Sequence, residues 1–173
     1  MKVIMMSIRP EWVAKILNGE KTIEIRKRFP KDYVGWVYIY CTKGKTTTIN
    51  LETLLFDNPQ NAIRNGKVVA RFWCDKVEEI DHWFSIVPCF NQTCLSVEEL
   101  TKYLGTKNGY AIHITKLEIF NKPKEIGEFS VMREYTNCGR CPHAIDFGCS
   151  SNGWCRTIKP LNRAPQSWCY VEV

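Results

Sequence analysis

A lysine, a glutamate and an arginine stand close together in one segment, and together they suit a charged ligand. Glu24 and Arg26 are two residues apart in an alternating run, so in a strand they share one face, about 7 Å apart. Lys21 follows Gly19, which permits a tight exit from a helix and places the lysine at the same edge. Arginine and lysine can hold a phosphate while a carboxylate accepts from an amino group, and partial burial would shift pKa values toward acid or base catalysis. The other interpretation is a solvated strand face with a weak ion pair.

Basic residues extend beyond this segment on both sides. Arg9 precedes Pro10 at the expected start of a helix, where free backbone N–H groups favour an anion. Cations alternate with aromatic residues over 26–36, which suits neutralisation of a nucleic-acid backbone together with base stacking. The predicted ligand-binding residues are Arg9, Lys21, Glu24, Arg26 and Arg28.

Four cysteines near the end of the sequence have the spacing of a structural metal site. They are Cys138, Cys141, Cys149 and Cys155. Two thiolates in a C-x2-C turn followed by two more suit tetrahedral Zn²⁺, and four thiolates leave no open coordination position. Apolar residues are sparse over 134–160, so an ordered lobe there needs a cross-link, such as a metal ion, in place of a hydrophobic core. We predict structural zinc, with His143 as a substitute ligand, an iron–sulfur cluster or disulfides as alternatives.

The hydrophobic pattern predicts the elements that position the basic segment. Residues 3–8 form an almost continuous apolar run, which is typical of a strand buried on both faces. Pro10 and one apolar stripe over 10–17 predict a helix. The alternation over 22–27 predicts a half-buried strand.

Most of the remaining pattern also indicates strands. The runs 36–41, 67–77 and 110–120 are rich in β-branched and aromatic residues, and Ser96 with Glu99 predicts a capping box for a short helix. This order does not alternate as a parallel βαβ array would. We therefore predict an α+β fold, a small mixed β-barrel with peripheral helices and a short cysteine-rich metal-stapled lobe.

Length and composition fit one domain with an appendage. The chain has 173 residues, 45% hydrophobic and 24% charged, with a net charge of +6. We divide it into a barrel (1–130), a cysteine-rich lobe (131–165) and a closing strand (166–173). No apolar run approaches the roughly 20 residues that span a bilayer, and no leader pattern is present, so we expect a cytoplasmic protein without a membrane partner.

The basic segment also matches a family signature. Residues 19–26 fit the pattern G-x-K-x-x-E-x-R, and they follow Ser7-Ile8-Arg9-Pro10 and an amphipathic stretch. This combination resembles the ASCH domain of the PUA-like superfamily, in particular its small stand-alone versions in bacteria and phages. The segments 66–75 and 109–114 are also similar to that family, so the resemblance covers roughly residues 3 to 120.

The resemblance implies a PUA-like barrel and a cleft lined by the motif lysine, glutamate and arginine. Family members are thought to bind RNA or nucleotides there. One branch hydrolyses an acetylated cytidine with the motif lysine, a threonine at the position of Glu24 and a further glutamate. This sequence has a glutamate where that branch has its threonine.

Three function classes follow. The leading prediction is a module that binds RNA or a nucleotide through Lys21, Glu24 and Arg26, with a modified base among the candidate ligands. The alternative is a nucleoside amidohydrolase or RNA-cleaving hydrolase in which Lys21 and Glu24 are catalytic. The third is an adaptor that presents barrel and zinc lobe to a protein partner.

Overall fold

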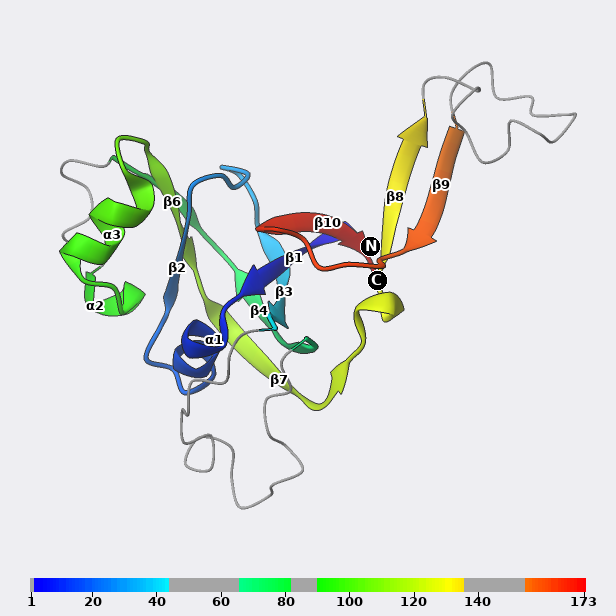
Figure 1. The fold of residues 1–173 in the computed structure, drawn as a ribbon, viewed down its shortest axis with the longest axis horizontal. Coiled ribbons are helices and arrows are strands. Elements are labelled where there is room, and N and C mark those ends of the chain that lie inside the picture. Colours follow the sequence, from blue (N-terminus) through cyan, green and yellow to red (C-terminus); the bar gives the residue numbers. More distant parts are fainter. Residues whose placement is uncertain (1, 44–65, 82–89, 136–154) are drawn as a thin grey trace, which may run out of the picture.

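The computed structural model describes residues 2–43, 66–81, 90–135 and 155–173, and β-strands dominate them (Figure 1). The strands are β1 (Lys2–Ile8), β2 (Ile23–Arg26), β3 (Gly35–Cys41), β4 (Val68–Cys74), β5 (Val77–Ile80), β6 (Gly109–His113), β7 (Thr115–Lys124), β8 (Ser130–Tyr135), β9 (Cys155–Pro160) and β10 (Trp168–Glu172). The helices are α1 (Pro10–Leu17), α2 (Phe90–Thr93), α3 (Val97–Leu104) and the 3-10 turn η4 (Ile126–Glu128). The fold is mixed α+β, mostly sheet with few helices.

The strands form two sheets that share two bent segments of chain. The larger sheet has the order β7-β4-β3-β1-β10-β8-β9 and the smaller has the order β2-β6-β5. Only Asp75 and Lys76 separate β4 from β5, and only Ile114 separates β6 from β7. Since β4 pairs with β7 and β5 pairs with β6, both antiparallel, one long bent ladder links the sheets.

The described strands do not close into the predicted β-barrel. β1 pairs along one edge with β3 and along the other with β10, and β2 forms no ladder with the larger sheet. The Arg26 side chain spans the opening instead, because its Nη2 donates to the Ser7 carbonyl at 2.7 Å. The curved sheet therefore has a gap between β1 and β2.

The first strand, helix and strand form where the pattern predicts them. Val13 and Ile16 of α1 are buried in the main core beside Ile4 and Met6 of β1. The helix ends before Gly19, whose φ of 80° lies in the left-handed region that glycine adopts without strain. The turn brings the chain directly into β2.

The predicted strands 67–77 and 110–120 are each divided in the structure. The run 67–77 breaks at Asp75 and Lys76, which separate β4 from β5. The run 110–120 breaks at Ile114, whose N–H donates to the Thr22 carbonyl at 2.9 Å rather than to the ladder. β7 continues past the predicted end at position 120, and Pro123 lies within it. β7 is an edge of its sheet, the position where a strand tolerates proline.

The helix α3 covers one face of β2. The predicted capping box is present, with Glu99 N donating to Ser96 Oγ and Ser96 N donating to the Glu99 carboxylate. Leu100 and Leu104 are buried against Ile23 and Ile25 in a second core cluster. The side chain of Tyr103 is 40% exposed.

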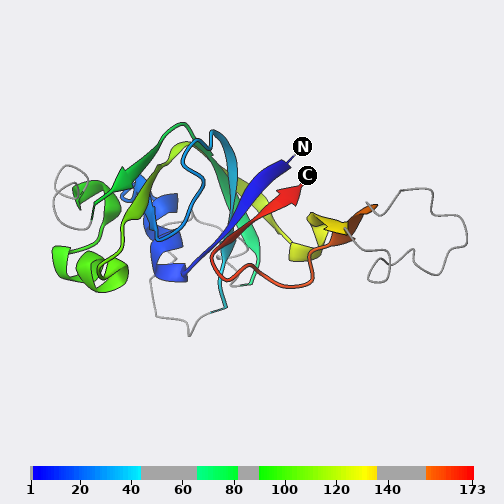
Figure 2. The same cartoon turned by 90° about the horizontal axis from the view of Figure 1, so that it is seen from above.

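The hairpin of β8 and β9 projects from the sheet at the end opposite α2 and α3 (Figures 1 and 2). β8 joins β10 through the single residue pair Ser130↔Glu172. The base is further held by buried Phe129, whose carbonyl accepts from Leu161 N at 2.7 Å. β10 pairs antiparallel with β1, which brings the two ends of the described chain side by side (Figure 2).

Candidate functional site

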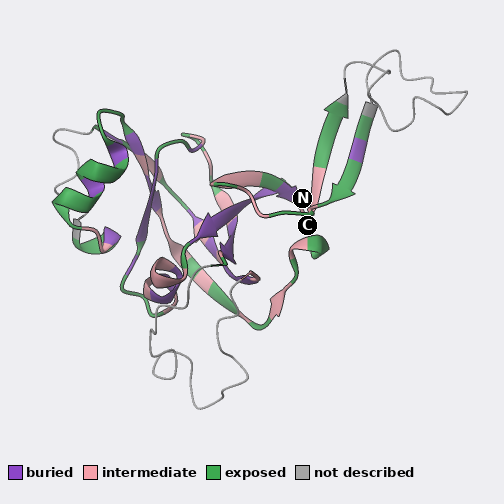
Figure 3. Cartoon of the chain, in the orientation of Figure 1, coloured by how far each residue is buried: buried purple, intermediate pink, exposed green. Residues whose placement is uncertain are grey.

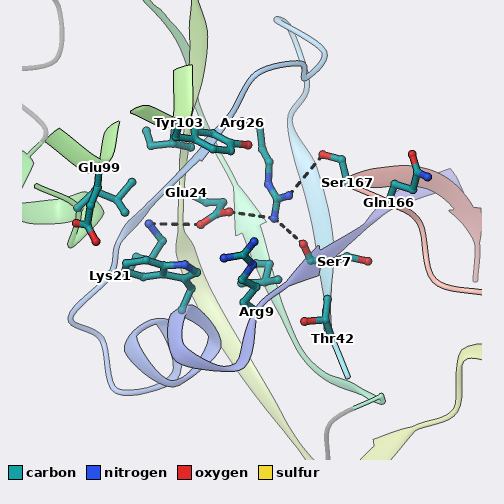
Figure 4. A pocket seen from close by; sticks show the side chains of 14 residues that line it. Ser7, Arg9, Lys21, Glu24, Arg26, Thr42, Glu99, Tyr103, Gln166 and Ser167 are labelled. Carbon is teal, nitrogen blue, oxygen red and sulfur yellow. Dashed lines mark hydrogen bonds and ion pairs between the residues drawn. The ribbon is translucent and has the colours of Figure 1, made fainter. Parts of the chain in front are cut away.

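A cavity of about 500 Å³ lies in the gap between β1 and β2 (Figure 4). The end of β1, the start of α1, β2 and the α3 region form its walls, and the segment before β10 contributes two residues. Its lining residues are Ser7, Ile8, Arg9, Trp12, Lys21, Glu24, Ile25, Arg26, Thr42, Leu95, Glu99, Tyr103, Gln166 and Ser167.

The alternation of β2 directs its charged residues into this cavity. Ile23 and Ile25 contact the α3 cluster, while Glu24 and Arg26 have the opposite parity and reach the cavity wall. The strand is nevertheless not half-buried as predicted, since all four of its residues are buried (Figure 3). Exposure is 2% for Lys21, 7% for Glu24 and 8% for Arg26. The polar face of β2 therefore lines the cavity and is shielded from bulk solvent by the other residues of its walls.

Glu24 lies between the two cations and pairs with both. Its Oε2 is 3.4 Å from Lys21 Nζ and its Oε1 is 3.0 Å from Arg26 Nη2. Lys21 Nζ also donates to the Thr93 carbonyl at 2.6 Å and lies 5.4 Å from the centroid of the Trp12 ring. The lysine is thereby held between β2, α1 and the end of α2.

Arg26 links β2 to both neighbouring segments but keeps one donor unused. Its Nη2 bonds the Ser7 carbonyl, and its Nη1 donates to Ser167 Oγ at 3.4 Å. Its Nε is buried and has no hydrogen-bond partner among the described residues. Buried donors are normally satisfied, so this guanidinium has capacity for a further acceptor.

Burial controls the protonation of Lys21. Desolvation is the largest influence and lowers the pKa of its ammonium, while the Glu24 carboxylate raises it and the nearby Arg26 lowers it further. The triad has two cations and one carboxylate, a formal charge of +1 (2 − 1). The cavity thus combines an excess of positive charge with a lysine that gives up its proton more readily than a solvated one.

The structure brings four of the five predicted ligand-binding residues to one cavity. Arg9 lies exposed at the rim and forms no ion pair among the described residues. Arg28 does not reach the cavity, because the chain has left β2 by that point. It is exposed and lines a neighbouring groove.

Several lining residues were not predicted from the sequence. Glu99 and Tyr103 come from α3, and Gln166 and Ser167 precede β10. The capping pattern located the helix, but no local signal shows that it packs over β2. The Ser167 contact spans 141 positions from Arg26.

The predicted metal ligands fall largely outside the described residues. This applies to Cys138, Cys141 and Cys149, and the side chain of Cys155 at the start of β9 is likewise not described. Within the described ranges, no group of three or more metal-ligating side chains occurs. Zinc therefore stays a prediction. In those same ranges, no helix has the length and apolar character required to cross a membrane.

Comparison with known proteins identifies a shared fold. No family model and no curated protein matches the chain. Among solved structures, the ASCH protein of Zymomonas mobilis is 19% identical with a TM-score of 0.53, and the match covers 71% of this chain and 73% of that chain. Two mutants of the same protein give the same TM-score at 18% and 19% identity. At this level of identity the likeness shows the fold alone.

Proposed function

We propose that this chain is an ASCH-domain protein of the PUA-like superfamily that binds a nucleotide, free or within an RNA strand, between β1 and β2. The fold shared with the Zymomonas ASCH protein supports the family assignment. The position of the motif residues Lys21, Glu24 and Arg26 on one cavity wall supports the site. In this assignment the curved sheet is an open barrel, and the ligand enters through the gap between β1 and β2.

The burial of three charged side chains around a cavity carries this proposal. Transfer of such groups out of water is costly, and apolar residues of similar size would often serve folding as well or better. Lys21, Glu24 and Arg26 are each at least nine-tenths buried. A site that must recognise a polar, charged ligand explains why they stand there.

The cavity offers a separate contact to each part of a nucleotide. Its volume is within the range of roughly 300–1,000 Å³ that small-molecule sites occupy. Trp12 and Tyr103 present aromatic surfaces to a base, and Arg9 can approach a phosphate from the rim. A carboxylate has about four acceptor positions, so Glu24 can accept from a base amino group while it pairs with both cations.

The substitution Arg9→Gln tests the phosphate contact without disturbing the buried triad. We expect weaker binding of nucleoside monophosphates, and a smaller loss of affinity when the salt concentration is raised, because a charge pair that salt screens has been removed. Binding of the corresponding nucleosides should not change. Isothermal titration at two salt concentrations measures both, with the exposed Lys107→Gln as the charge-matched control. Absence of nucleoside, nucleotide and RNA binding by the unmodified protein would refute the proposed function.

The lowered pKa of Lys21 favours hydrolysis as the second candidate function. An amine whose pKa is lowered by burial, 3.4 Å from the Glu24 carboxylate, is suited to proton transfer at a bound nucleoside or RNA. The same titration samples decide this point when RNA and nucleosides are recovered and analysed by mass spectrometry. Chemical change that requires Lys21 would establish an enzyme, and intact ligand would establish a binding module.

We also propose that Cys138, Cys141, Cys149 and Cys155 hold a structural zinc ion. The support is their spacing and the need for a staple in a lobe with few apolar residues. We expect one zinc per chain in native mass spectrometry, released by a thiol-blocking reagent, with unfolding confined to the lobe. A native mass equal to that of the bare chain, with no metal released, would contradict it.

A further inference from the structure

A second groove, of about 1570 Å³, lies beside the cavity and is lined largely by the part of the chain beyond the ASCH motif. The β8–β9 hairpin, the segment that leads into β10 and β10 itself form most of it, and the residues after β2 complete it. Tyr103, Gln166 and Ser167 line both the groove and the cavity. The two sites are therefore adjacent and share one wall.

The charge of this groove has one sign. None of the described residues that line it is acidic. Five cations line it, all of them exposed, and none forms an ion pair within the described part of the chain. They are Lys27, Arg28, Arg133, Lys159 and Arg163.

Several cations elsewhere on the molecule have acidic partners. Lys31 pairs with Glu79, Arg71 with Glu118 at 2.7 Å, and Arg156 of the hairpin with Glu134 at 3.0 Å. The groove differs from these surfaces because it gathers five cations and has no acidic residue among the described residues that line it. A concave surface of one sign concentrates a ligand of the opposite sign.

Aromatic rings accompany these cations. Tyr103 and Tyr170 are 40% and 37% exposed, and Lys27 Nζ lies 5.2 Å from the centroid of the Tyr103 ring. Trp168 is held in place because its Nε1 donates to the Arg28 carbonyl at 2.6 Å, and it contacts Tyr170 edge to face with centroids 5.6 Å apart. Grooves that combine cations with fixed aromatic rings suit single strands, whose phosphates pair and whose bases stack.

We infer that this groove binds the phosphate backbone of a single-stranded nucleic acid and directs one of its nucleotides into the cavity. The second part rests on the proposed function, whereas the first depends on the groove alone. A duplex fits this arrangement poorly, because a paired base must leave the stack before it can enter a cavity. The hairpin and its return segment would thereby extend a single-nucleotide site to a longer strand.

The test compares three forms of the full chain by fluorescence anisotropy with an oligonucleotide of about 12 residues. The groove variant is R28Q/K159Q/R163Q. The control is K102Q/K107Q/K122Q, which removes the same charge at exposed positions that line neither site. Each is titrated between about 50 and 200 mM salt. RNA and DNA of one sequence distinguish recognition of the backbone from recognition of the 2′-hydroxyl.

We expect the groove variant to lose about 2 in the slope of log K against log salt, since each single-strand phosphate contact contributes about 0.7. This corresponds to roughly 50-fold weaker binding at about 0.15 M salt, where the control stays close to the unmodified protein. A nucleoside monophosphate, which occupies only the cavity, should bind the groove variant normally.

Each departure from this pattern has a separate meaning. If groove variant and control bind the oligonucleotide alike, the groove inference is overturned while the nucleotide site stands. If the groove variant loses the oligonucleotide but the unmodified protein binds no monophosphate, the groove stands and the proposed cavity function fails. If the unmodified protein binds neither ligand, both are refuted.

Discussion

Replacing Glu24 with glutamine is expected to lower the free energy of unfolding by about 3–5 kcal/mol, the range found when one partner of a buried ion pair is removed. Glu24 is the only carboxylate paired with Lys21 and Arg26 among the described residues. A neutral amide would leave both buried cations without a counter-charge. Since a domain is stable by only about 5–15 kcal/mol, this single change removes a large share.

Urea unfolding of the Glu24→Gln protein measures this effect, and two comparisons identify its cause. Glu79→Gln breaks the exposed pair with Lys31 and should produce no measurable change. Adding Lys21→Met to Glu24→Gln removes one of the two uncompensated cations, so the double variant should be more stable than Glu24→Gln alone. Equal stability of Glu24→Gln and the unmodified protein would show that Glu24 does not balance these charges.

The same triad shows which features of the site the local sequence could predict and which it could not. The alternation over 22–27 places Glu24 and Arg26 on one face, and the glycine turn places Lys21 beside them, because these are properties of a few consecutive residues. Burial of that face was not predictable. It arises from α3 and from the segment before β10, which is joined to β1 by Ser7 Oγ donating to the Pro165 carbonyl at 2.6 Å across 158 positions.

The gap between β1 and β2 has a similar origin. Most strands were recognisable from their own pattern, although β8 and β9 were not predicted. The closure of a barrel depends instead on which strands pair. β10, more than 150 positions from β1 in the sequence, occupies the edge of β1 opposite β3. The charged groove was likewise not predicted as a unit, although Arg28, Lys159 and Arg163 were visible as separate cations. Tertiary pairing, and not composition, gathers them.

The substitution Lys21→Met should separate binding from stability. It removes a charge that burial disfavours and leaves Glu24 paired with Arg26 at 3.0 Å, so at neutral pH we expect a much smaller loss of stability than for Glu24→Gln. Ligand binding should weaken by roughly 10- to 100-fold, the effect of one lost charge-assisted hydrogen bond. Titration with a nucleoside monophosphate, with Lys122→Met as the exposed control, measures this difference. Unchanged affinity would remove Lys21 from the site.

The pH dependence of unfolding provides a readout of Lys21 that does not require a ligand. The pKa of Lys21 is lowered from 10.5 in the folded protein, so between the lowered value and 10.5 the unfolded chain binds more protons than the folded one. In that window the free energy of unfolding must gain a positive contribution as the pH rises. The Lys21→Met protein lacks this contribution and should become less stable relative to the unmodified protein as the pH rises through this window. The free energies of unfolding of the two proteins, measured in urea, would run parallel with pH if Lys21 titrated as a solvated lysine. That result would show that burial does not lower the pKa of Lys21.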